Sequence, residues 1–374
     1  MTDVQRISRL PLAEEPLLQE EEDRPTILPL RFPDIWMWYK QQEGLFWPVS
    51  DADLSMDPIH WRNNMTPGMR AYYKYILAMF GPADEMITRN LEERFIREFQ
   101  VKEVCYVYTA QKMNEQVHSE GYSRLIEAIF SDEEREEMFN AVKTMPVVGK
   151  MMKWVDDWIC SDAPIGERLA AFALFEGGLF QGQFLSIQLL KEQNIMPGMT
   201  TLNELISRDE DFHSQFACFL LNNYIANRPS EETVHRIAKE ASDLFDEFVQ
   251  AACDAAREAE GLPATAQCPV PSVTEDMMST YVRMVIDTVC EDMGYSRLFK
   301  AKNPYPEAVK LSLNSVLKTN FFESLVTQYN IMVDYEFVAS IKAVETRSFA
   351  KPEAPTPLSS MMDKIRMPLV RARG

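Results

Sequence analysis

Apolar residues recur every three to four positions over most of the chain, the spacing that buries one face of an α-helix. No convincing run of alternating apolar and polar residues predicts a strand. Ser131 followed by Asp132–Glu134 is typical of a helix start, and Pro197–Gly198 indicates a turn between two helices. The pattern predicts long helices at roughly 66–97, 99–130, 133–144, 150–160, 165–191, 201–225, 230–259, 274–294 and 317–345.

Three parts of the chain fall outside this helical pattern. Residues 1–25 are charged, and we expect a mobile N-terminal segment there. The stretch from Pro29 to Asp57 is rich in tryptophan and proline, which indicates an ordered arm packed on the helical body. Residues 346–374 are rich in proline and end in basic residues, so we expect a flexible C-terminal tail. A single helical domain is therefore predicted over 26–345.

The most apolar helix, between Arg168 and Lys191, has to be distinguished from a membrane span. It contains Glu176 and three glutamines, at 181, 183 and 188. A carboxylate and three amides would be costly in a bilayer, whereas a helix that is apolar on most sides suits the centre of a soluble bundle. We therefore predict no membrane insertion.

The charge balance excludes several kinds of partner. The chain of 374 residues has 57 acidic and 38 basic residues and a formal net charge of -19, so its surface repels nucleic acid and anionic membranes. Its six cysteines are scattered without a C-x-x-C pair, and the N-terminus shows no hydrophobic signal segment. We therefore expect free thiols and a cytoplasmic location.

Glutamate and histidine recur at one particular spacing. The chain has only four histidines, and three of them lie in E-x-x-H, namely Glu115–His118, Glu210–His213 and Glu232–His235. Residues three apart on a helix share a face, so each pair can bind one metal ion. Two such helices, with one carboxylate from each of two more, make the di-iron pattern of ferritin-like bundles. Oxygen and imidazole donors without thiolates suit iron or manganese.

Two further carboxylates complete this pattern. Glu176 lies in the apolar helix, where an isolated ionised carboxylate would cost several kcal/mol without a cation or partner. Asp84 lies in another helix with an apolar face, and Pro82 removes one intrahelical donor, so we expect a kink before Asp84. The predicted fold is thus an all-α, ferritin-like helical bundle with a di-metal carboxylate site. Its predicted metal ligands are Asp84, Glu115, His118, Glu176, Glu210 and His213.

The remaining two histidines have simpler interpretations. A single E-x-x-H is more often a solvated pair than a metal site, and Glu232–His235 lies among charges of the exposed type in the first turns of a helix. His60 is expected in a loop. Neither is predicted to bind the metal.

One tyrosine is placed to face the predicted metal site. Tyr122 follows His118 by four residues and so shares its side of the helix. Phe180 and Phe184 follow Glu176 by four and eight residues, which gives that face an apolar lining. A buried tyrosine here is either ordinary core or, in a dry pocket beside an oxidising metal pair, a radical site.

These motifs belong to a longer collinear series that resembles the small, radical-generating subunit of class I ribonucleotide reductase. The resemblance runs from about Glu15 to Tyr329. It is carried by EPLL at 15–18, FPDIWMWYK at 32–40, DADLS at 51–55, NLEERF at 90–95, HSEGYSRLI at 118–126, FEGGLFQGQF at 175–184, IMPG at 195–198, NELISRDEDFH at 203–213 and KTNFFE at 318–323.

The resemblance implies a cofactor and a radical site. The six ligands would hold two iron ions, with Mn/Fe and Mn/Mn pairs as alternatives, and O2 would activate them. Tyr122 would carry the radical, in an apolar pocket formed by Phe180, Phe184 and Ile206.

The resemblance also implies an electron path and two kinds of partner. The path to the surface would comprise His118, Asp209 and Trp36, with Arg208 beside it. The small subunit would be a homodimer and would pass the oxidising equivalent to a large catalytic subunit. That subunit would reduce ribonucleoside diphosphates for deoxyribonucleotide synthesis.

Two other functions use the same scaffold. A stand-alone di-metal oxidase or oxygenase would act on its own substrate, and the last residues, MPLVRARG, differ from the family's docking tail in a way that favours it. That class often has glutamate at the first ligand position, however, where this chain has Asp84. An iron-storage or non-catalytic protein is disfavoured, because the six ligands and Tyr122 are all present.

Overall fold

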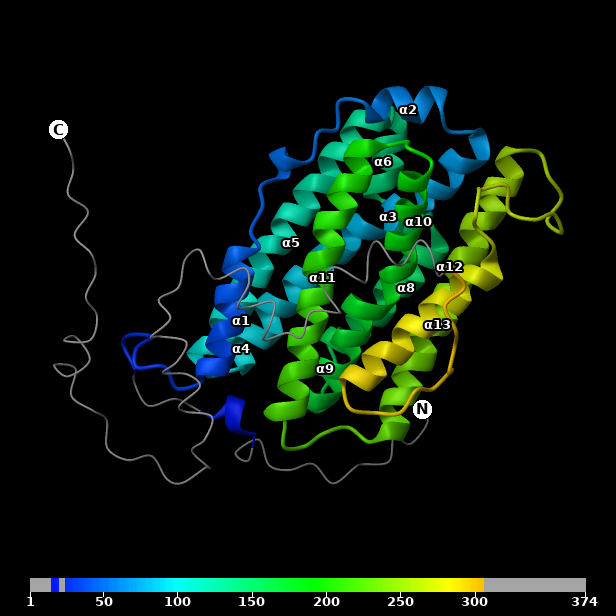
Figure 1. Cartoon of the computed structure of the whole chain (residues 1–374). Coiled ribbons are helices and arrows are strands. Elements are labelled where there is room, and N and C mark those ends of the chain that lie inside the picture. The colour runs from blue at the N-terminus through cyan, green and yellow to red at the C-terminus, as the bar shows by residue number, and fades with distance from the viewer. Residues whose placement is uncertain (1–14, 20–23, 306–374) are drawn as a thin grey trace, which may run out of the picture. The chain divides into compact units, whose positions relative to one another are not determined.

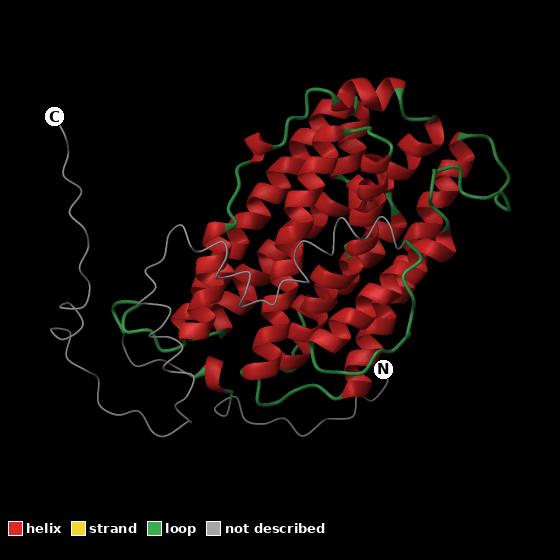
Figure 2. Cartoon of the chain, viewed as in Figure 1, coloured by secondary structure: helices red, strands yellow, loops and turns green. Residues whose placement is uncertain are grey.

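Helices make up the regular structure of residues 15–19 and 24–305, the part of the chain that the computed structural model describes, and no strand occurs within it (Figure 2). The predicted all-α class is therefore confirmed. The predicted helix at 317–345, the KTNFFE motif, the predicted tail at 346–374 and most of the predicted N-terminal segment lie outside the described residues.

Long helices packed along one another form the body of the protein (Figure 1). Helix α5 (Lys102–Ile129) packs against α3 (Pro67–Asn90) and α11 (Pro197–Asn223). The apolar segment forms α9 (Ile165–Leu174), a π-helical turn η5 (Phe175–Leu179) and α10 (Gln181–Glu192), all three packed against α11.

Two further long helices cover this group. Helix α12 (Glu231–Ala259) contacts α3 and α9, and α13 (Glu275–Asp292) lies against α12 and η5. Residues of α9, η5 and α10 are buried almost without exception, because neighbours surround them on every side. As predicted, this segment is the centre of a bundle. No helix among the described residues is long and apolar enough to span a membrane.

The predicted boundaries hold to within a few residues, but three predicted helices are interrupted. The first continues beyond α3 as a π-helical turn η4 (Leu91–Phe95) and a short α4 (Ile96–Glu98). The helix predicted at 133–144 divides into α6 (Asp132–Phe139) and α7 (Ala141–Thr144), and η5 interrupts the apolar helix. A π-turn adds a residue without changing the apolar character of the sequence, so periodicity does not reveal it.

Shorter elements complete the described chain. Helix α8 (Pro146–Ile159) matches the helix predicted at 150–160, and a 3₁₀ turn η2 (Pro16–Leu18) begins the described part. The arm rich in tryptophan contains α1 (Pro33–Gly44), a 3₁₀ turn η3 (Val49–Asp51) and α2 (Asp57–Asn63). His60 therefore lies in a helix, and the prediction of a loop was wrong, since α2 is too short to show a period.

Helix α2 holds the beginning of α11, which carries three of the site residues. The backbone N–H groups of Gly198 and Met199 donate to the carboxylate of Asp57 at 3.0 and 2.7 Å, and that of Met196 donates to Nδ1 of His60 at 3.0 Å. A Cβ atom on Gly198 would lie 2.4 Å from the carbonyl oxygen of Asp53, so this close approach requires glycine. Burial raises the pKa of Asp57 to about 6, against the lowering effect of the two N–H donors.

We expect Asp57→Ala to lower the free energy of unfolding by about 1–3 kcal/mol, because it leaves two buried N–H groups at the start of α11 without their acceptor. Urea unfolding followed by circular dichroism measures the change. Asp243→Ala is the matched control: Asp243 is 56% exposed and pairs with Lys239 on the surface of α12, so little change is expected there. Equal effects of the two variants would contradict the role of Asp57.

Candidate metal centre

Four segments of the bundle bring the predicted ligands together in its interior. Helix α3 supplies Asp84, α5 supplies Glu115 and His118, η5 supplies Glu176, and α11 supplies Glu210 and His213. Each of these side chains is at most 2% exposed. In α5 and α11 the spacing of three places each glutamate and its histidine on one inward face.

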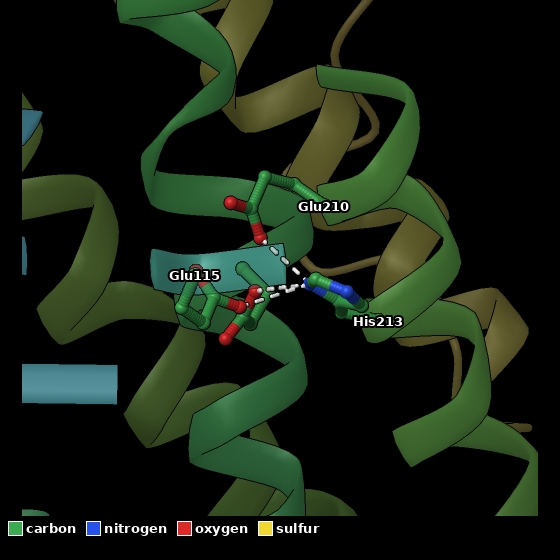
Figure 3. A group of neighbouring side chains, drawn as sticks. Glu115, Glu210 and His213 are labelled. Atoms are coloured by element: carbon green, nitrogen blue, oxygen red, sulfur yellow. Dashed lines mark hydrogen bonds and ion pairs between the residues drawn. The ribbon is translucent and has the colours of Figure 1, made fainter. Parts of the chain in front are cut away.

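The imidazole of His213 lies at the centre of one half of the site (Figure 3). Its Nδ1 is 3.1 Å from an oxygen of Glu115, 3.1 Å from an oxygen of Glu210 and 3.6 Å from an oxygen of Glu176. One ligand atom from each of these four residues lies within 4.8 Å of all the others. This spacing is compact enough for one ion to contact all four.

The imidazole of His118 marks the other half. Its Nδ1 lies 3.0 Å from the second oxygen of Glu210 and 3.4 Å from the second oxygen of Glu115. Glu115 and Glu210 thus each face both imidazoles with different oxygens, so both carboxylates would help to hold a metal pair. Asp84 lies close enough for the charges of His118, Glu115 and Glu210 to shift its pKa.

The electrostatics of this cluster favour a cation. Burial raises the pKa of Asp84 and Glu176 well above the usual range of a carboxyl, and the neighbouring carboxylates add to the shift. Burial alone would lower the pKa of the two histidines, but hydrogen bonds to the surrounding carboxylates raise it well above the ordinary value. Without positive charge, these acidic groups oppose one another's ionisation.

Unpaired polar atoms test whether the residues fit a metal pair. Four buried atoms in the cluster lie in ion-pair or electrostatic contact but make no hydrogen bond of regular geometry, namely Asp84 Oδ2, Glu115 Oε2, Glu176 Oε2 and His118 Nδ1. Leaving such atoms unpaired in an apolar interior is costly, and coordination to a cation would satisfy all of them. Four carboxylates and two imidazoles, without a thiolate, match the donors that iron and manganese accept. The residues therefore fit.

A second group of residues forms a hydrogen-bond network with the candidate ligand His118. Nε2 of His118 lies 3.2 Å from Oδ2 of Asp209, and the same oxygen accepts a hydrogen bond of 2.7 Å from Nε1 of Trp47. Arg208 donates to the other oxygen of Asp209 at 3.0 Å and to the carbonyl of Leu45 at 2.8 Å. Burial alone would raise the pKa of Asp209, but the hydrogen bond and charge of His118 hold it below its ordinary value.

The structure brings Trp47, rather than Trp36, to Asp209. The indole of Trp47 is stacked against His118, with ring centroids 6.0 Å apart and an angle of 19°. Trp36 lies on α1, where its ring contacts Tyr39 at 4.8 Å and Tyr106 at 5.6 Å. Both tryptophans lie in the same arm, and sequence spacing could not show which of them the chain carries to Asp209 after α1 ends.

Tyr122 occupies a dry pocket beside the ligands. It is 1% exposed, and its hydroxyl has no hydrogen-bond partner. Burial raises its pKa well above the usual range, and Asp84 is the carboxylate with the largest added effect. The ring of Phe80, which the sequence analysis missed, stacks on Tyr122 at 4.4 Å and 4°. Phe80 precedes Asp84 by one helical turn, a spacing that would have indicated it.

Two of the three predicted pocket residues, Phe180 and Phe184, contact this phenylalanine, and the third, Ile206, is buried. Phe80 contacts Phe184 at 5.2 Å and Phe180 at 5.9 Å, and Ile206 is 1% exposed. His235 lies apart from the cluster, with Nε2 2.8 Å from the carbonyl of Ser296. The six cysteines are free, as expected.

Comparison with known proteins identifies the family. A sequence profile described as "Ribonucleotide reductase, small chain" matches residues 24–304. The chain belongs to the ribonucleotide reductase small chain family. It is 44% identical over 317 residues to the ribonucleoside-diphosphate reductase small chain of African swine fever virus (strain Badajoz 1971 Vero-adapted), covering 84% of this chain and 92% of the viral one. Identity to the small chain of Nicotiana tabacum is 40% over 319 residues, covering 85% and 92%.

Two solved structures share the fold. The Rnr4 homodimer of Saccharomyces cerevisiae superimposes with a TM-score of 0.68 at 26% identity, covering 85% of this chain and 93% of that one. Dimanganese(II)-NrdF of Streptococcus sanguinis superimposes with a TM-score of 0.59 at 16% identity, covering 76% and 95%. The predicted ferritin-like fold and the predicted function, the radical-generating subunit of an oxidoreductase, are thus confirmed.

We expect His213→Ala to weaken divalent metal binding about 10- to 100-fold or more, because His213 faces three of the carboxylates. Titration of the metal-free protein with Co(II), followed by its visible absorption and by calorimetry, measures the change. His235→Ala removes the histidine of the surface E-x-x-H and is the matched control, with unchanged affinity expected. A similar loss of affinity in both variants would contradict the assignment.

Proposed function

We propose that this small chain holds two metal ions and stores an oxidising equivalent on Tyr122. Iron is the first choice of metal, with Mn/Fe and Mn/Mn as alternatives that the same donors accept. When bound and activated by O2, the metal pair would act as the oxidant that removes one electron from a phenol. The proposed ligands are Asp84, Glu115, His118, Glu176, Glu210 and His213.

The observation that carries this proposal is the setting of Tyr122. Its hydroxyl is buried and unpaired, its ring lies under Phe80, and the carboxylates of the cluster are near enough to raise its pKa. A phenol that cannot ionise easily must lose its proton together with its electron. Asp84, which has an unpaired oxygen, is the group that we propose receives this proton. The apolar pocket then excludes water from the oxidised ring.

We propose that Trp47, Asp209 and His118 carry the oxidising equivalent away from the site. Asp209 accepts a hydrogen bond from Trp47 and lies within hydrogen-bond distance of His118, so the three side chains form one continuous connection. An oxidised indole becomes acidic at its N–H, and Asp209 is positioned to hold that proton. Arg208 fixes the second oxygen of Asp209. This connection favours export of the oxidising equivalent over a stand-alone oxidase, which would not need it.

The relatives indicate the partners of this chemistry. They are small chains of ribonucleoside-diphosphate reductase, and one solved neighbour is a homodimer. We propose that this chain forms a homodimer, and that a large catalytic subunit uses the exported equivalent to reduce ribonucleoside diphosphates for DNA synthesis. The net charge of -19 argues against direct contact with nucleic acid. Six free thiols suit a reducing cytoplasm.

We expect Tyr122→Phe to abolish the tyrosyl radical signal that appears when protein loaded with Fe(II), or with Fe and Mn, is exposed to oxygen. Electron paramagnetic resonance measures the signal. Tyr108→Phe is the matched control, since Tyr108 is also fully buried with an unpaired hydroxyl and lies on the same helix. The signal should persist in that variant. A signal that survives in Tyr122→Phe would refute the radical assignment.

We expect Trp47→Phe to retain the tyrosyl radical but to lose nucleotide reduction, because phenylalanine neither oxidises readily nor donates to Asp209. The assay combines the chain with a cognate large subunit and follows deoxyribonucleotide formation. Trp36→Phe, on the same arm, is the control and should retain most of the activity. If Trp36→Phe alone abolished reduction, the path predicted from the sequence would be correct and the one proposed here wrong.

A further inference from the structure

A small apolar pocket lies between α3, α8 and the segment formed by α9 and η5. All of its lining side chains are apolar except Asn90 and Arg168. The charge of Arg168 is turned away into an ion pair with Glu98 and a hydrogen bond to a backbone carbonyl, so its aliphatic part lines the pocket. The pocket is thus an apolar space in an acidic protein.

The pocket is lined by half-buried residues at one end and by fully buried residues at the other. Its half-buried residues include Trp154 and Trp158 of α8, whereas Ile87 and Phe175 are only 1% and 2% exposed and mark its deep end. Ile87 follows the ligand Asp84 by three residues on α3. Phe175 immediately precedes the ligand Glu176. The deep end therefore adjoins the two segments that supply these carboxylates.

Size and lining restrict what the pocket can hold. Its volume of about 30 Å³ exceeds the roughly 10–15 Å³ that one water-sized molecule needs. It is far below the roughly 300–1,000 Å³ of sites for organic ligands. Water is disfavoured because it needs two to four polar partners, whereas small apolar molecules such as xenon enter apolar cavities readily. A small apolar gas is the occupant that fits.

Aromatic rings continue from the deep end to the tyrosine. Phe175 contacts Phe180 at 4.6 Å, Phe180 contacts Phe80 at 5.9 Å, and Phe80 stacks on Tyr122 at 4.4 Å. Phe175 is also the first residue of the π-helical turn η5, where hydrogen bonding departs from the regular α-helical pattern. These rings form continuous apolar contacts from the pocket to Tyr122, and such surroundings favour an apolar molecule over water and ions.

We propose that this pocket admits dioxygen to the metal centre and sets the oxygen concentration at which the centre is oxidised. The proposal rests on the proposed function, because only an oxygen-dependent centre needs such an entry. Ala171, which is 2% exposed and lines the pocket, is the residue whose enlargement should close it.

Xenon tests the pocket without any metal or activity. Crystals of the metal-free protein pressurised with xenon should show a xenon atom in the pocket. Ala171→Leu should abolish that density while the chain stays folded, as judged by its unfolding midpoint. If Ala171→Leu does not fold, Val155→Phe fills the same pocket from α8. Absence of xenon from the wild-type pocket would overturn the proposal.

Oxidation kinetics test the role of the pocket. Stopped-flow mixing of Fe(II)-loaded protein with a series of oxygen concentrations should show a several-fold higher half-saturating oxygen concentration in Ala171→Leu, with the same final radical yield at saturating oxygen. Ala251→Leu, on α12 and outside the pocket lining, is the control and should match the wild type. Xenon bound in the wild type together with unchanged oxygen dependence in Ala171→Leu would overturn the proposal.

The two proposals fail in different ways. If the wild type forms no radical with any of the metals, the radical function proposed above is refuted, and oxygen consumption by the metal-loaded protein replaces the radical as the kinetic readout. Unchanged consumption in Ala171→Leu at every oxygen concentration would then overturn the entry role. A raised half-saturating concentration would support it.

Discussion

The burial of four carboxylates and two imidazoles at one point is the constraint on which the rest of this structure depends. Charged groups in an apolar interior are tolerated only when they are compensated. The unpaired oxygens of Asp84, Glu115 and Glu176 show that hydrogen bonds within the protein do not supply the whole compensation. Bound cations would supply the rest of the compensation, and binding of metal would then be thermodynamically linked to the stability of the fold.

The surroundings of this cluster are divided into a polar and an apolar side. On the polar side, the carboxylate of Asp209 connects His118 to Trp47 through hydrogen bonds, and this carboxylate can hold a proton. On the apolar side, Phe80 covers Tyr122 and continues into further aromatic rings. The separation matches the two needs of the proposed function, since transfer of the oxidising equivalent through an indole requires a proton acceptor and a stored radical requires a dry enclosure.

Helices outside the four that supply ligands hold the site in place. Helix α1 places the side chain of Gln42 3.1 Å from Nε2 of His213, and its continuation carries Trp47. Helix α2 holds the start of α11 through Asp57 and His60. The arm that the sequence predicted to pack on the helical body therefore positions both a candidate ligand and the proposed electron path. Positioning of this kind fixes the orientation of metal-binding side chains.

The sequence by itself determined the helices and the choice of candidate ligands, because both follow from local spacing. Apolar residues at helical period predicted the bundle, and two E-x-x-H pairs with Glu176 and Asp84 predicted the metal centre. Only the tertiary structure decided which tryptophan reaches Asp209 and which ring covers Tyr122, and that His60 helps to hold α11. These contacts join segments that are far apart in the chain, and they depend on how the helices pack together. The periodicity along a single helix carries no information about that packing.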